Sequence, residues 1–224
     1  MSSEQKLYPI VAKWMKKQFH CFNVAINTGL IHSRIDVVGI RDIGGDLSGD
    51  VETISIEVKR GSEPFATACG QALGYKVYAN RVYLADVREK SFTDEELRIA
   101  SHLGIGLIQI RKNKCREVLT SPFYVPMSSL NLRLLEKLRL GRCQFCSSFF
   151  QIGTHSGQRY SNLSREDLAR AMKEKKGLMF WNYEVAKRKD RLGLRPLKNS
   201  GTYERRFVCS ECVEVFIAQI SGQK

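Results

Sequence analysis

The sequence predicts an α/β fold, a mixed sheet with helices on both faces, followed by a small cysteine-rich module. Two observations predict this arrangement. Three β-rich runs follow one amphipathic helix, after which helical and β-rich segments alternate. Two Cys-x-x-Cys pairs then come after the last of these segments. A chain of 224 residues accommodates one ordinary domain and a smaller one, so we expect domains at 1–140 and 141–224.

The first helix is predicted from apolar residues at helical spacing that begin at Leu7. Pro9 is compatible with this helix only in its first turns, because proline lacks the N–H that an inner turn requires. Three short β-rich runs follow at 22–26, 34–41 and 53–60, separated by Gly, Asn, Asp and Ser clusters. These runs predict an antiparallel meander.

A second helix is expected to open at Pro64, a residue favoured in the first helical turn, and to end before the β-rich run 81–86. Thr93 and Glu96 have the spacing of a capping box, which predicts the start of a third helix. Gly104 is suited to its end, because glycine tolerates the left-handed conformation that closes many helices.

An apolar strand at 105–110 and an amphipathic helix at 130–140 complete the first domain, and the predicted element order begins αβββαβαβ. The second domain is expected to contain an inserted helical segment, residues 151–206. A helix start at 163–167 and an apolar helical stripe support this insertion. The stripe comprises Leu168, Met172 and either Met179 or Trp181.

The net charge of +13 is large for this length and indicates a polyanionic partner, such as nucleic acid, unless it serves solubility alone. Residues 1–140 hold 20 Lys and Arg against 15 Asp and Glu, whereas residues 141–224 hold 16 against 8. The excess is therefore concentrated in the second domain. With no apolar signal region and no bilayer-length apolar stretch, we expect a cytoplasmic protein without a membrane partner.

The run 53–60 places Glu57 and Lys59 on one face of a strand, because side chains alternate between the faces. Asp36 lies among apolar residues, where a bare carboxylate is costly unless a cation or hydrogen bonds satisfy it. If the two strands are adjacent, one divalent cation could be shared by both acids, as phosphodiester hydrolysis requires. The alternative is an edge strand whose Glu57 and Lys59 face solvent.

With these residues the chain resembles the PD-(D/E)xK phosphodiesterases, the superfamily of many restriction enzymes and Holliday-junction resolvases. The resemblance covers roughly residues 4–120 and implies a restriction-endonuclease-like αβββαβ core. It implies that Asp36 and Glu57 bind Mg²⁺ or Mn²⁺ together with the carbonyl of Val58, and that Lys59 assists catalysis. Ile35 replaces the proline of the family name, which is among the least constrained parts of the pattern.

Two further residues match less constant parts of the same family pattern. Glu4 matches an acid on the first helix, and Gln71 matches a glutamine on the helix after the motif. Gln71 and Tyr75 lie one helical turn apart and so share a face. Alternatively, Glu4 is a surface acid, and Gln71 and Tyr75 form an ordinary packed or surface pair.

Four cysteines in two knuckles predict a structural zinc site, because four thiolates are the ligands that tetrahedral zinc prefers. The ligands are Cys143, Cys146, Cys209 and Cys212. The pattern resembles a zinc ribbon with possible strands at Phe150 and at 213–217, interrupted by a 62-residue separation between the knuckles. The alternative is two incidental dithiols or a redox-active pair.

The sequence contains no Walker A loop, GxGxxG, GxSxG or HExxH motif, so nucleotide-driven, dehydrogenase, serine-hydrolase and zincin functions lack support. The expectation is a metal-dependent nuclease acting on DNA rather than RNA, and a cut of both strands by one active site per chain would favour a homodimer. A non-catalytic nucleic-acid-binding or assembly protein and an RNA-processing nuclease remain alternatives. The basic residues expected to contact phosphates are Lys173, Lys175, Lys176, Lys187, Arg188, Lys189, Arg191, Arg205 and Arg206.

Overall fold

The computed structural model describes residues 4–30, 33–44, 50–152, 158–159, 178–182, 204–213 and 215. These residues divide into two compact units, with the boundary after Leu134, inside helix α4 (Ser128–Lys137). The sequence predicted the boundary after residue 140. Among the helices of the described residues, none has both the length and the apolar character needed to span a bilayer.

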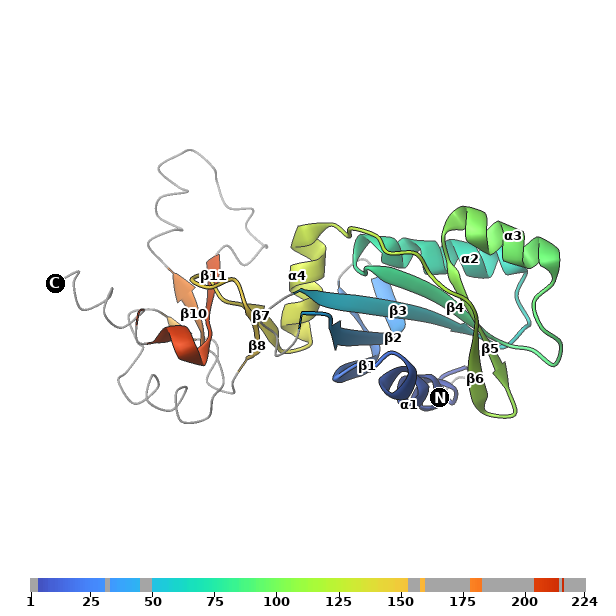
Figure 1. Ribbon diagram of the computed structural model, residues 1–224, viewed down its shortest axis with the longest axis horizontal. Coiled ribbons are helices and arrows are strands. Elements are labelled where there is room, and N and C mark those ends of the chain that lie inside the picture. Colours follow the sequence, from blue (N-terminus) through green and yellow to red (C-terminus); the bar gives the residue numbers. More distant parts are fainter. Residues whose placement is uncertain are drawn as a thin grey trace. The chain divides into compact units, whose positions relative to one another are not determined.

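The first unit contains a six-stranded mixed sheet in which the strands follow one another in chain order (Figure 1). β1, β2 and β3 form the predicted antiparallel meander, β3, β4 and β5 are parallel, and β6 returns antiparallel to β5. The strands are β1 (Asn23–Leu30), β2 (Ser33–Asp42), β3 (Val51–Lys59), β4 (Arg81–Val87), β5 (Gly106–Arg111) and β6 (Lys114–Leu119).

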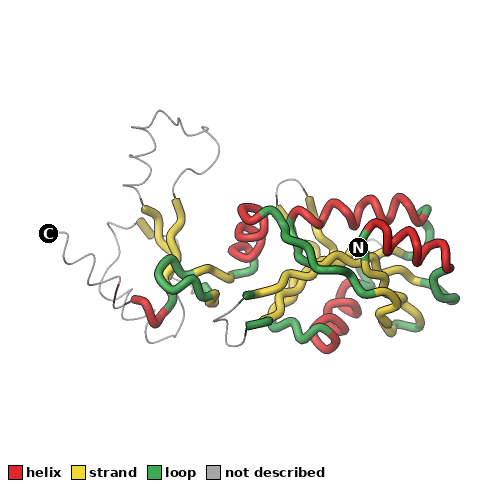
Figure 2. The backbone as a smooth tube through the Cα atoms, turned by 45° about the horizontal axis from the view of Figure 1, so that its top comes forward, coloured by secondary structure: helices red, strands yellow, loops and turns green. Residues whose placement is uncertain are grey.

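Helices cover both faces of this sheet, as the sequence predicted (Figures 1 and 2). Helix α1 (Tyr8–Gln18) packs on one face, where its Val11 and Met15 lie in a core with Ile56 and Val58 of β3. The other face carries α2 (Phe65–Leu73), its short continuation η1 (Gly74–Val77) and α3 (Asp94–Leu103). Strand alternation therefore turns Glu57 and Lys59 away from α1 and toward the α2 side.

Local sequence signals account for the helix ends. Pro9 lies in the first turn of α1, where its missing N–H leaves no inner hydrogen bond unmade. The Thr93 hydroxyl accepts from the Glu96 amide at 3.2 Å, and the Glu96 carboxylate accepts from the Thr93 amide at 2.8 Å. Gly104 ends α3 in the left-handed conformation, with φ of 63°. The predicted capping box and helix end are both confirmed.

One strand and one helix end differ from the prediction because residues other than glycine adopt positive φ there. Lys112 and Asn113, with φ of 48° and 59°, form the turn that leads into β6, a strand that the sequence pattern did not predict. Helix α4 ends at Lys137, and Arg139 takes a φ of 65° before the expected end near Gly141. Asparagine tolerates this conformation better than most residues, but lysine and arginine give no such signal.

The second unit contains two small sheets. In one, β7 (Leu140–Arg142) pairs antiparallel with β8 (Phe149–Gln151), which includes the predicted strand residue Phe150. In the other, β10 (Leu178–Asn182) lies between β9 (Gln158–Arg159) and β11 (Glu204–Val208).

Two predictions for this unit are wrong. Met179 and Trp181 lie on strand β10 rather than on a helical stripe, because an apolar and aromatic run favours a strand once β11 is available to pair with it. The insertion 151–206 is therefore not simply helical. Val213 and Val215 have helical geometry, so the strand of the second knuckle is β11, before the cysteines and not after them. The predicted helix start at 163–167, with Leu168 and Met172, lies outside the described residues.

Candidate functional site

Asp36 and Glu57 come from neighbouring antiparallel strands. The last registered pair of β2 and β3 at this end is Val37 with Ile56, and the next step of the ladder places residues 36 and 57 opposite one another. Glu57 is only 6% exposed and Asp36 is half-buried. The negative charge of Asp36 is close enough to raise the pKa of Glu57. The two acids thus form the pair that the sequence predicted; we refer to them with Lys59 and Glu63 as the acidic site.

The carboxylate of Asp36 is held by two donors. The Tyr8 hydroxyl donates to its Oδ1 at 2.6 Å, and the backbone N–H of Val58 donates to its Oδ2 at 2.9 Å. Burial nevertheless raises the pKa of Asp36, although both hydrogen bonds and the charge of Lys59 act in the opposite direction. The charge of Glu4 raises that pKa as well, so Glu4 lies within electrostatic reach of the acidic site.

The carboxylate of Glu57 is held by a donor from the helices on the face of the sheet opposite α1. The hydroxyl of Tyr75, a buried residue of η1, lies against Glu57 Oε2 and also 2.8 Å from the Arg34 carbonyl. Burial is the main cause that raises the pKa of Glu57, and the hydrogen bonds from Tyr75 and Lys59 only partly offset it. Burial and the charge of Glu57 also raise the pKa of Tyr75, which therefore remains a neutral donor.

Lys59 connects Glu57 with a third acid. Its Nζ lies 2.9 Å from Glu57 Oε1 and 3.3 Å from Glu63 Oε2, and the lysine is only 6% exposed. Burial alone lowers the pKa of Lys59, but the two carboxylates outweigh it, so that the pKa is raised. Lys59 is therefore a cation near neutral pH and cannot serve as a general base there.

The charges of the acidic site do not balance. When ionised, Asp36, Glu57 and Glu63 carry three negative charges against the one positive charge of Lys59, which contacts Glu57 and Glu63 and acts on Asp36 through its charge alone. Each oxygen of Asp36 and Glu57 accepts one hydrogen bond from the protein, and a carboxylate oxygen has a further lone pair for a ligand. Carboxylate oxygens are the ligands that hard divalent cations take in proteins, and the binding of Mg²⁺ or Mn²⁺ at this site stays a prediction.

Several residues of this region were predicted from the sequence only in part or not at all. Gln71 is exposed on α2, whereas Tyr75, one turn later, contacts Glu57 directly. Tyr8 and Glu63 were not predicted as site residues. A tyrosine on an apolar helix face needs a partner for its hydroxyl, and Glu63 is four residues after Lys59, but neither signal is specific. Metal ligation by the carbonyl of Val58 stays a prediction.

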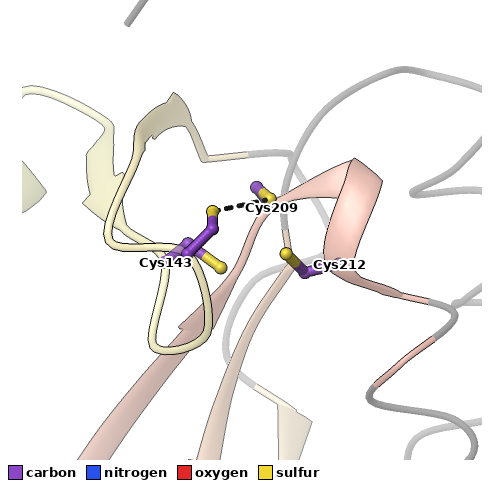
Figure 3. Close-up of side chains that lie close together, drawn as sticks. Cys143, Cys209 and Cys212 are labelled. Atoms are coloured by element: carbon purple, nitrogen blue, oxygen red, sulfur yellow. Dashed lines mark hydrogen bonds between the residues drawn. The ribbon is translucent and has the colours of Figure 1, made fainter. Parts of the chain in front are cut away.

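The four predicted zinc ligands converge in the second unit. Cys143 follows β7, Cys209 follows β11, and Figure 3 shows their side chains directed toward that of Cys212. The sulfur atoms of these three residues and of Cys146 all lie within 4.8 Å of one another, and the sulfurs of Cys146 and Cys209 are 3.7 Å apart. A tetrahedral zinc with bonds of about 2.3 Å separates its sulfur ligands by about 3.8 Å. The cluster can therefore hold a metal ion, consistent with zinc.

Backbone contacts position the two knuckles. The amide of Cys143 donates to the Ser148 carbonyl at 2.8 Å, and the amide of Ser147, in the left-handed conformation, donates to the Cys143 carbonyl at 3.0 Å. The amide of Gln144 donates to the Phe207 carbonyl at 2.9 Å, which joins the first knuckle to β11. Hydrogen bonds from Ser148 and neighbouring thiols lower the pKa of Cys146 to about 7 against the opposing effect of burial.

The predicted phosphate contacts of this unit fall almost wholly outside the described residues. Of the nine basic positions, only Arg205 and Arg206 are described, as backbone of β11. Their contribution to nucleic-acid binding stays a prediction.

Comparisons with known proteins identify one similar solved structure, whose function is unknown. No protein-family model matches the chain, and no curated protein is significantly similar to it. A protein of unknown function from Silicibacter pomeroyi has a solved structure that is 21% identical in sequence, with a TM-score of 0.45. The similarity covers 62% of this chain and 84% of that one.

Proposed function

We propose that this chain is a divalent-metal-dependent nuclease that hydrolyses phosphodiester bonds of DNA, with Asp36, Glu57 and Lys59 as its reactive residues. The observation that carries the proposal is the acidic site itself. Two carboxylates from facing positions of adjacent strands, Glu57 buried and Asp36 half-buried, have raised pKa values and share the single positive charge of Lys59 with Glu63. Such perturbed acids are far more frequent at functional sites than in ordinary sheet surfaces.

The order of the elements supports the same proposal. The first unit begins α1, β1, β2, β3, α2, β4, with an antiparallel meander followed by a parallel strand. This is the αβββαβ order that the resemblance to the restriction-endonuclease-like nucleases implies. The resemblance expects an acid on the second strand and the Glu-x-Lys pair on the third; Asp36 lies on β2 and Glu57 with Lys59 on β3, which supports the proposal.

The residues of the acidic site and their neighbours have separate roles in the proposed reaction. Tyr8 and the Val58 amide hold Asp36, and Tyr75 holds Glu57, so the two carboxylates are oriented before substrate arrives. A bound Mg²⁺ or Mn²⁺ would polarise the phosphoryl group and lower the pKa of an attacking water. Lys59, kept protonated by Glu57 and Glu63, is suited to stabilise negative charge that develops on the phosphate.

Cleavage assays with the purified full chain test this proposal. We expect plasmid or branched DNA to be cut in Mg²⁺ or Mn²⁺ but not in EDTA. Asp36→Asn and Lys59→Ala should each lower the rate by about 100-fold or more, as the loss of a group that stabilises the transition state does. Glu95→Gln and Lys13→Ala, at exposed positions of α3 and α1, are matched controls that should leave the rate unchanged.

The other outcomes separate the alternatives. Binding of DNA without cleavage in either metal would show a non-catalytic nucleic-acid-binding protein. Cleavage of structured RNA but not of DNA would show an RNA-processing nuclease. If Asp36→Asn cleaves as fast as the wild type, the acidic site is not the reaction centre.

A further inference from the structure

A basic hollow lies at the β5–β6 edge of the sheet in the first unit. Its volume is about 630 Å³, and it is lined by Gln109 and by four cationic side chains against a single acid, Glu89. The cationic residues are Arg111, Lys112, Lys114 and Arg116. All four are exposed, so their charges are available to a ligand. We refer to this region as the edge hollow.

The strand register concentrates these charges on one face. Gln109 is opposite Arg116, and Arg111 is opposite Lys114, so that all four side chains project from the same side of the hairpin. Like charges directly opposite one another on a sheet are destabilising. Arg111 has one ion pair, with Glu89 at 3.1 Å, but both partners are more than half exposed and the pair is weak. A bound anion would relieve this repulsion.

The edge hollow lies on the same face of the sheet as the acidic site. Register pairs run in one row from Lys59 to Asp86 of β4, from there to Gln109 of β5, and on to Arg116 of β6. Residues paired in this way share a face, and it is the face opposite to α1. Since adjacent strands are about 4.8 Å apart, the row spans about 14 Å from Lys59 to Arg116.

The residues between the two ends of this row, Asp86 and Gln109, are buried. Asp86 is buried and forms an ion pair with Arg88, whose Nε lies 2.8 Å from its carboxylate and whose guanidinium also pairs with Glu96 of α3 at 2.7 Å. Gln109 donates to the carbonyls of Arg88 and Lys90, both at 3.1 Å, which holds the β4–α3 loop as one wall of the edge hollow. A strand that reaches both the acidic site and the edge hollow therefore crosses the layer that covers Asp86 and Gln109, not the sheet itself.

We propose that the edge hollow binds backbone phosphates of the nucleic-acid strand whose scissile bond lies at the acidic site, an inference that rests on the proposed nuclease function. At about 3.4 Å per nucleotide of a stacked strand, the 14 Å row sets the shortest separation between these phosphates and the cleaved bond at about four nucleotides. Arg111, Lys114 and Arg116 contact phosphate and not base edges, so the contribution to affinity is independent of sequence.

Binding measured in EDTA tests the site without any cleavage. The probe is a fluorescently labelled 12-nucleotide single strand, and the readout is anisotropy over a series of salt concentrations. The double variant Arg111→Gln with Lys114→Gln should bind about tenfold more weakly, and the salt slope of its affinity should fall by about 1.4, the value for two lost phosphate contacts on a single strand. Its thermal stability should be unchanged or higher, because it removes a like-charge pair.

The matched control removes the same charge from the opposite face. Lys13→Gln with Lys16→Gln changes two exposed lysines of α1 and should leave both affinity and salt slope close to wild type. Equal weakening by the two double variants would overturn the proposal, since it would show an effect of net charge alone. Binding of anionic phospholipid vesicles in place of the oligonucleotide would overturn it as well.

Cleavage kinetics then link the edge hollow to the acidic site. The Arg111→Gln, Lys114→Gln variant should raise KM and leave kcat unchanged for long strands. Substrates too short to reach four nucleotides beyond the cut should show no difference from wild type. If the wild type cleaves nothing in Mg²⁺ or Mn²⁺, the nuclease function fails, while the anisotropy result still decides whether the edge hollow binds nucleic acid.

Discussion

At the scale of single residues, the carboxyls of Asp36 and Glu57 destabilise the folded protein when they are ionised. Burial raises the pKa of both carboxyls above their ordinary values of 3.8 and 4.5, so the folded state holds their protons more tightly than the unfolded chain. The stabilisation that protonation of these two carboxyls provides is complete at a pH below their ordinary pKa values. It is lost as the pH rises through the raised, folded values. At neutral pH without a cation, the pair therefore lowers the free energy of unfolding.

Replacing Asp36 tests this conclusion. In the metal-free protein, Asp36→Asn should raise the Tm at pH 7, by about 2–4 °C for each kcal/mol regained in a chain of this size. An asparagine can still accept from the Val58 amide and donate to the Tyr8 oxygen, so both stay hydrogen-bonded, although the Tyr8 hydroxyl proton loses its acceptor.

The advantage of Asp36→Asn should shrink as the pH is lowered from 7 toward the ordinary carboxyl range, because the wild-type acid then becomes protonated. Thermal melts in EDTA at several pH values measure both effects, with Glu95→Gln as control. A Tm that drops at pH 7, or a difference independent of pH, would contradict the electrostatic account.

At the scale of single elements, α3 owes its start to local chemistry. Thr93→Ala should lower the free energy of unfolding by about 1 kcal/mol, because the Glu96 amide loses the hydroxyl that caps it. Urea denaturation monitored by circular dichroism is the measurement. Thr67→Ala, at an exposed position inside α2, makes the same chemical change without a cap and should stabilise slightly, by a few tenths of a kcal/mol. Equal effects at the two sites would exclude the capping interpretation.

The elements that could be predicted are those whose own residues carry a local signal. Helix α1, the meander and α3 carry periodicity or caps within their own residues, and they were found near their predicted bounds. Strand β6 was missed because its turn uses Lys112 and Asn113 with positive φ in place of glycine. Strand β10 was misassigned because a short apolar run is compatible with either conformation until a partner strand decides between them.

At the scale of the whole molecule, the two compact units should respond separately to loss of metal. We expect one zinc per chain by elemental analysis and selective loss of structure in the second unit upon chelation, since structural zinc contributes on the order of 10 kcal/mol in binding free energy. Amide NMR signals of residues 4–134 should persist. Cys209→Ser should reproduce the effect of the chelator, whereas Cys115→Ser, a cysteine of the first unit, should retain the zinc. A chain that holds no zinc after purification without chelator would refute this assignment.

Sequence alone determined the features that depend on local period and spacing. Strand alternation places Glu57 beside Lys59, and the Cys-x-x-Cys spacing provides both cysteine knuckles. Only the tertiary structure decided which distant residues complete these sets. The hydroxyls of Tyr8 and Tyr75 reach the two acids through helix packing, and the row from Lys59 to Arg116 exists through the register of four strands. Register and packing depend on contacts between segments far apart in the chain, which no local pattern of residues encodes.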